Sequence, residues 1–178
     1  HHGAQNDEVT TSTNSHSKVM EKIALTHILD KVNIDNMEKT IIVHDCDIMA
    51  DNLIQLKWPN AIQKYDPNHY CTKQKRLIDA YCCDESLKSI SERLKKFYSE
   101  LLHERTLSLE EKVTKWKNAL NHYIETEKWT KENNENSISS LKKIIDIFSG
   151  TFEKVDAHFS TNPCESFNFS RALLASKN

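Results

Sequence analysis

The feature that most constrains the fold is a strand–helix–strand pattern. The β-branched run Thr40–Val43 stops at the polar residues His44–Asp47, which is typical of a buried strand that ends at a site. A helical apolar pattern follows over Ile48–Leu56, and Trp58–Asn60 indicates a turn. A second short strand is predicted over Ala61–Tyr65. The sequence therefore predicts a βαβ unit, with acidic residues at the ends of both strands.

Glycine and proline are scarce outside this unit. The 178 residues contain 2 Gly and 3 Pro, so we expect few turns and long helices. The predicted fold class is an α-rich α/β domain, since the length suits one domain with a real core. Helices are predicted over 18–32, over 73–105 with a break near 82–85, over 108–123, over 139–148 and from Asn162-Pro163 onward, whereas 33–38 and 129–137 are predicted loops.

Composition narrows the environment of the chain. No apolar run approaches the roughly 20 residues of a membrane span, and the polar N-terminus has no signal-peptide pattern. The 5 cysteines are an odd number without framework spacing, so we expect reduced thiols and an intracellular or nuclear protein. The net charge of −2 gives no indication of a nucleic-acid partner. The chain begins at His rather than Met, which suggests a fragment, a processed form or a tagged protein.

The order of motifs resembles a known family. Asp45, a helix, Trp58–Asn60 and then Asp66-x-x-His69 together look like the second half of a Mutator-like (MULE-type) DNA transposase domain. Two further stretches match in the family's order: Ser17–Leu25 is similar to its S-x-x-M-E-x-x-x-L helix, and Thr161–Asn168 is similar to its N-x-x-E-S-x-N box.

The resemblance implies part of a ribonuclease H-like core with an all-helical insertion. Residues 1–16 would be a flexible arm and 17–178 the partial transposase domain. Within that domain, 17–72 would form the βαβ part of the core and 73–150 the insertion. Residues 151–178 would form a closing helix that carries the last acid.

In this family, DNA strand cleavage and transfer use two divalent metals, Mg²⁺ or Mn²⁺, held by carboxylates. By position, Asp45 matches the second catalytic acid and Glu165 the third. Asp47 is an alternative ligand beside Asp45. The resemblance further suggests that Asp66, His69 and Asn162 support the site.

Each assignment has a plainer alternative. Asp45 and Asp66 could simply cap the helices that follow them, and Glu165 could form a capping box with Asn162. The first catalytic acid of the family also has no counterpart. It should lie on a strand before Ser17, where the sequence shows no strand, so we expect no complete three-acid site and no activity from this chain alone.

Partners follow from the resemblance and from charge. DNA, as transposon ends, and a homo-oligomer are the partners that the family implies, and no membrane is expected. No structural zinc is expected, because no second ligand pair accompanies His69 and Cys71. Five basic residues could contact DNA phosphates: Lys73, Lys75, Arg76, Lys95 and Lys96. Acidic residues are interleaved with them, so the alternative is a solvated helix face of mixed charge.

Three functions therefore stand beside one another. The first is a fragment of a transposase of the DDE type. The second is a non-catalytic, transposase-derived module that binds DNA or protein through its helices. The third disregards the resemblance and is a small α-rich interaction protein, which would be favoured if Ile41–Val43 were helical or if the two strands did not pair.

Overall fold

The computed structural model describes residues 19–31, 40–159 and 161. The chain divides into two units, and each strand passes from one unit into the other. Of the described residues, the N-terminal unit contains 19–31, 40–42 and 46–63, and the C-terminal unit contains 43–45, 64–159 and 161.

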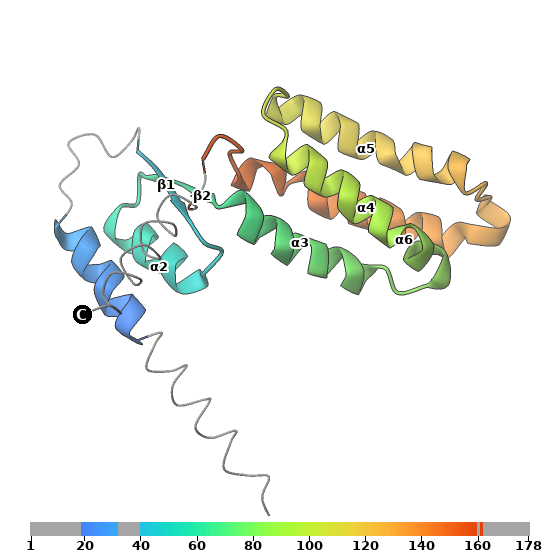
Figure 1. Cartoon of the computed structure of the whole chain (residues 1–178). Coiled ribbons are helices and arrows are strands. Elements are labelled where there is room, and N and C mark those ends of the chain that lie inside the picture. The colour runs from blue at the N-terminus through green and yellow to red at the C-terminus, as the bar shows by residue number, and fades with distance from the viewer. Residues whose placement is uncertain (1–18, 32–39, 160, 162–178) are drawn as a thin grey trace, which may run out of the picture. The chain divides into compact units, whose positions relative to one another are not determined.

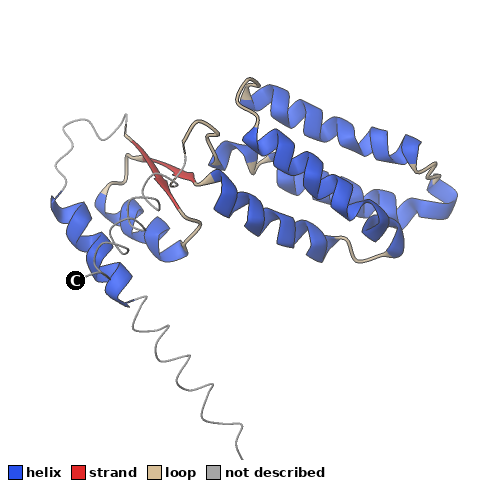
Figure 2. Ribbon diagram, in the orientation of Figure 1, coloured by secondary structure: helices blue, strands red, loops and turns tan. Residues whose placement is uncertain are grey.

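The predicted strand–helix–strand pattern is confirmed. Strand β1 (Ile41–His44), helix α2 (Ile48–Lys57) and strand β2 (Ile62–Tyr65) follow one another, and the strands form a two-stranded parallel sheet (Figure 2). The Ile62 N–H donates to the Thr40 carbonyl at 2.9 Å. Neither condition that would favour the α-rich interaction protein holds, because Ile41–Val43 is extended and the strands are paired.

The N-terminal unit has a small interior. Its predicted first helix is present over 19–31. The buried apolar residues of this unit's described part are Leu29, Ala50 and Ile54, and an ion pair joins Asp30 to Lys57. Several large apolar side chains of the unit are exposed: Val19, Met20, Ile23, Ile28, Ile41, Ile48, Leu56 and Ile62.

The C-terminal unit is built from four long helices. These are α3 (Pro67–Tyr81), α4 (Glu85–His103), α5 (Leu109–Thr126) and α6 (Lys131–Ser149). Helix α4 contacts the other three, and α6 also contacts α3 and α5, so the helices pack side by side (Figure 1). The predicted break between the first two of these helices is confirmed, and Asp84 caps α4 by accepting from the Leu87 N–H at 2.7 Å.

An aromatic cluster fills the middle of this unit. Tyr98 contacts Trp116 and Phe148 edge-on, with ring centroids 5.4 and 5.7 Å apart, and Phe152 lies 5.2 Å from Tyr98. The Trp116 indole N–H donates to the Ile145 carbonyl at 3.0 Å. The indole can therefore be buried without leaving its N–H group lacking a hydrogen-bond acceptor.

Helix starts follow local capping chemistry. Ser108, where the sequence predicts that a helix starts, is the N-cap of α5 and is part of a capping box, because its hydroxyl accepts from the Glu111 N–H while the Glu111 carboxylate accepts from the Ser108 N–H. Helix α3 begins at Pro67, six residues earlier than predicted. The cause is Asp66, which caps the helix ahead of a proline that suits the first helical position.

The predicted loop over 129–137 is wrong, because α6 begins at Lys131. The Thr130 hydroxyl accepts from the Asn133 N–H at 3.3 Å and starts the helix. Asn134 has non-helical angles, φ −134° and ψ 23°, so the asparagine-rich start is kinked. The buried face farther along, which includes Leu141 and Ile144, provides the packing that outweighs the weak local propensity.

After α6 the chain returns to the sheet. A 3₁₀ turn, η2 (Phe152–Lys154), is followed by Val155, which forms a parallel bridge with Tyr65. The predicted closing helix lies outside the described residues. No helix in the described part of the chain is long and apolar enough to cross a membrane.

Two adjacent cysteines are expected to differ sharply in reactivity. Burial raises the pKa of Cys82, against a lowering by its hydrogen bond with Ser91, and the residue is 3% exposed, whereas Cys83 is exposed. A raised pKa means a smaller thiolate fraction near neutral pH. Iodoacetamide should therefore label Cys83 in the variant Cys82→Ser faster than it labels Cys82 in the variant Cys83→Ser. Mass spectrometry of the peptide that contains the remaining thiol measures the two rates. Equal labelling rates in the folded variants would contradict this.

Candidate functional site

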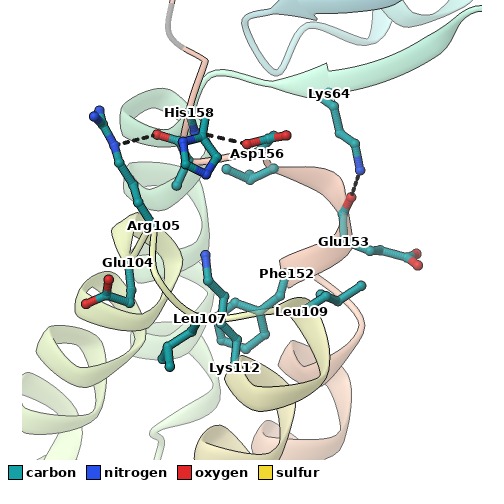
Figure 3. A pocket seen from close by; sticks show the side chains of 12 residues that line it. Lys64, Glu104, Arg105, Leu107, Leu109, Lys112, Phe152, Glu153, Asp156 and His158 are labelled. Carbon is teal, nitrogen blue, oxygen red and sulfur yellow. Dashed lines mark hydrogen bonds between the residues drawn. The ribbon is translucent and has the colours of Figure 1, made fainter. Parts of the chain in front are cut away.

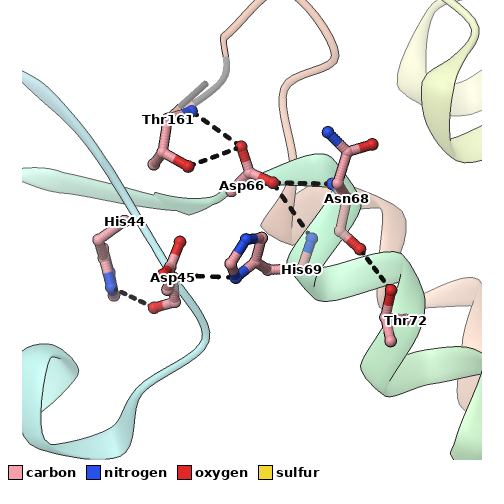
Figure 4. Close-up of polar contacts among 7 residues, drawn as sticks. All are labelled: His44, Asp45, Asp66, Asn68, His69, Thr72 and Thr161. Atoms are coloured by element: carbon pink, nitrogen blue, oxygen red, sulfur yellow. Dashed lines mark hydrogen bonds and ion pairs between the residues drawn. The ribbon is translucent and has the colours of Figure 1, made fainter. Parts of the chain in front are cut away.

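Two predicted site residues meet where the first strand ends. Asp45 follows β1, and His69 lies in the first turn of α3. The Asp45 Oδ2 and the His69 Nδ1 are 3.3 Å apart, and both side chains are about half exposed, at 52% and 44% (Figure 4). At this distance the carboxylate of Asp45 and the imidazole of His69 can interact directly.

His44 stabilises the turn that presents Asp45. Its Nδ1 lies 2.7 Å from the Asp45 carbonyl oxygen, and its ring packs edge-on against Tyr65 with centroids 5.3 Å apart. Tyr65 stacks in turn on Tyr70 of α3 at 5.1 Å. The backbone around Asp45 is thus supported by aromatic packing from β2 and α3.

Asp66 joins two distant parts of the chain. Its side chain is buried, and its Oδ1 accepts from the Asn68 and His69 N–H groups at 2.9 and 3.1 Å, which is the helix cap that the plainer alternative predicted. Its Oδ2 accepts from the Thr161 N–H at 2.8 Å and from the Thr161 hydroxyl at 3.1 Å. These four hydrogen bonds offset the cost of burying a carboxylate.

Of the other two predicted metal ligands, Asp47 and Glu165, Asp47 lies within the described residues. Asp47 accepts from the Met49 N–H at 2.8 Å and caps α2. Glu165 and Asn162 lie outside the described residues. Among the residues described, no group of three or more histidine, cysteine and acidic side chains is placed to hold a metal ion. Thr161 is a site residue that sequence reasoning missed, since the motif comparison used it only as the position before a box.

The predicted DNA-binding residues have different surroundings. Lys95 pairs with Asp79 at 2.7 Å and with Glu92 at 2.6 Å, and Asp79 raises the pKa of Lys95 most. The same contact lowers the pKa of Asp79. Lys96 lies 4.0 Å from Glu100. Of the remaining three, Lys73 and Arg76 are exposed and Lys75 is partly buried.

A pocket lies where the α4–α5 connection meets η2. It has a volume of about 240 Å³, and Figure 3 shows Arg105 donating to the Ala157 carbonyl, at 3.0 Å, and Lys64 donating to the Glu153 carbonyl. Burial lowers the pKa of Lys112. The lining favours no ligand class by its charge, because it contains three cations, Lys64, Arg105 and Lys112, and three acids, Glu104, Glu153 and Asp156.

Comparison of the chain with protein-family models, with curated proteins and with solved structures finds no match.

Proposed function

We propose that this chain is the C-terminal half of a Mutator-like transposase domain. The complete domain would have a ribonuclease H-like core and would cleave and join DNA strands. The motif order supports the proposal, and so does the parallel βαβ unit, in which Asp45 directly follows the first strand. Carboxylates at that edge of a parallel sheet can converge with groups carried by neighbouring elements.

The observation that carries the proposal is the pair formed by Asp45 and His69. The acid that matches the family's second catalytic residue lies 3.3 Å from the histidine of the Asp66-x-x-His69 motif. A carboxylate that has a neighbouring imidazole beside it has a second interaction that can orient it for metal binding. Both residues belong to the same ordered motif in the sequence, and their proximity supports a shared role.

Asp45 and Glu165 would hold the metals. Carboxylate oxygens are the ligands that Mg²⁺ and Mn²⁺ prefer, and the half-exposed Asp45 is accessible to a hydrated cation. The metals, when bound, would activate the attacking oxygen and stabilise the leaving oxygen. Because the 178 residues contain counterparts of only the second and third acids, we expect weak metal binding and no strand cleavage by them alone.

Manganese binding tests this proposal. Electron paramagnetic resonance titration should show that Asp45→Asn and Glu165→Gln each weaken Mn²⁺ binding by about tenfold or more. Asp146→Asn, on an exposed position of α6, is the matched control and should leave the affinity unchanged. Absence of Mn²⁺ binding by the unmodified chain, or equal affinities for all three variants, would contradict the proposal.

The second candidate is a non-catalytic DNA-binding module, which the exposed Lys73 and Arg76 on α3 favour. It differs from the first in needing no metal. Duplex DNA binding that persists in a chelator would favour it, provided that the affinity falls steeply with salt as several phosphate contacts require. Lys95 is expected to contribute little to such binding, because two carboxylates already pair with it.

A further inference from the structure

We infer that Asp66 is a positioning residue that latches the chain at Thr161 to the first turn of α3. It thereby fixes the start of the segment that carries Asn162 and Glu165. The latch consists of hydrogen bonds within the C-terminal unit. Its consequence for metal binding rests on the proposed function.

Comparison with the other capping aspartates shows that Asp66 does more than cap a helix. Asp47 and Asp84 cap α2 and α4, each by accepting from one nearby N–H, and both are only partly buried. Asp66 has a relative exposure of 0% and uses its second oxygen for a residue 95 positions away. Capping alone requires neither complete burial nor that long-range bond.

The path of the chain explains why a latch is needed there. After η2 the backbone is attached to the rest of the unit at Val155, which bridges Tyr65, and at Ala157, whose carbonyl accepts from Arg105 at 3.0 Å. Thr161 is the next attachment, and its N–H and hydroxyl both donate to one oxygen of Asp66. The chain after η2 is thus attached at Val155, Ala157 and Thr161, and Asp66 holds the last of these three.

The latch lies beside the Asp45–His69 pair. One Asp66 oxygen accepts from the His69 N–H and the other accepts from the Thr161 N–H, so a single carboxylate links the two residues (Figure 4). Glu165 follows Thr161 by four residues. Four residues of chain span at most about 14 Å, so fixing Thr161 limits how far Glu165 can lie from the turn that contains His69.

Hydrogen exchange tests the latch directly. In Asp66→Asn, we expect the Thr161 amide to exchange about tenfold or more faster, because a charge-assisted hydrogen bond to it is lost. Asp84→Asn is the matched control, since it removes the charge of an aspartate that caps α4 by accepting from the Leu87 N–H, and it should leave the Thr161 exchange rate unchanged.

Thr161→Val provides a test that leaves the cap of α3 intact. It removes the hydroxyl donor and keeps the N–H, so it should increase exchange of the residue-161 amide by less than Asp66→Asn does. Thr161→Ser, which keeps both donors, should leave the exchange rate of the residue-161 amide as slow as in the unmodified chain. Adding Thr161→Val to Asp66→Asn should increase the exchange rate of the residue-161 amide by a smaller factor than Thr161→Val does in the unmodified chain. The two effects are not additive because both changes act on one contact. Unchanged exchange in Asp66→Asn, with α6 amides still protected, would overturn the inference.

Metal affinity separates this inference from the proposed function. If both hold, Asp66→Asn weakens Mn²⁺ binding and Thr161→Ser keeps it, although neither residue is assigned as a ligand. If the unmodified chain binds no Mn²⁺, the proposed function fails, and the exchange rates still decide the latch. Mn²⁺ binding that Asp66→Asn leaves unchanged, despite faster exchange at Thr161, would overturn the positioning role.

Discussion

Replacing Trp116 by alanine is expected to destabilise the C-terminal unit by about 3–5 kcal/mol. Trp116 has a relative exposure of 0% and contacts Tyr98, Phe97 and Phe152 through its ring. The substitution removes this packing and leaves a cavity among helices α4, α5 and η2. The loss of the indole hydrogen bond adds little, because the Ile145 carbonyl also accepts from the Ser149 hydroxyl at 2.7 Å.

Urea denaturation followed by circular dichroism measures this effect. Lys117→Ala is the matched control, one position along the same helix on its exposed side, and should change the free energy of unfolding by about 0.5 kcal/mol or less. Trp116→Phe should lie between the two. A destabilisation by Trp116→Ala no greater than that of the control would show that the aromatic cluster is not the core of this unit.

Replacing Ile54 by alanine is expected to cost about 2–5 kcal/mol in the N-terminal unit. Ile54 is 1% exposed and is one of few large apolar side chains buried in the described part of that unit. We expect α2 amides to lose protection from hydrogen exchange, whereas α5 amides keep theirs. Leu56→Ala is a close control on the same helix, since Leu56 is 76% exposed and its loss removes little packing.

The contrast between these units makes the Ile54 result informative. If Leu56→Ala destabilises α2 as much as Ile54→Ala, the exposed side chain at position 56 is covered in solution. If Ile54→Ala lowers protection throughout α2 and α5 equally, the two units unfold as one. The expected result is selective loss in α2, because each unit has buried apolar residues of its own.

Local sequence signals predicted most elements because the physics behind them is local. The β-branched run at β1, the break before Asp84 and the cap at Ser108 each depend on residues a few positions apart. The start of α6 was missed for the opposite reason. Asparagines near its N-terminus disfavour a helix, and the packing that stabilises it comes from residues farther along and from other helices.

The candidate site was predictable only in part. Asp45 and His69 were singled out by their place in a motif, and they lie close together. The motif did not reveal what Asp66 contacts, since its partner Thr161 is 95 residues away and a contact at that separation leaves no periodic pattern. Capping and site support were weighed as alternatives for Asp66, but one carboxylate can perform both because its two oxygens face different parts of the chain.

The most direct test of the proposed function is a crystal structure of the chain soaked with Mn²⁺. The proposal predicts a manganese ion coordinated by the carboxylates of Asp45 and Glu165, with His69 still against Asp45. Metals that share a phosphoryl-transfer site lie about 4 Å apart, so their carboxylate ligands must converge. Ordered Asp45 and Glu165 carboxylates more than about 10 Å apart, with no metal between them, would contradict it.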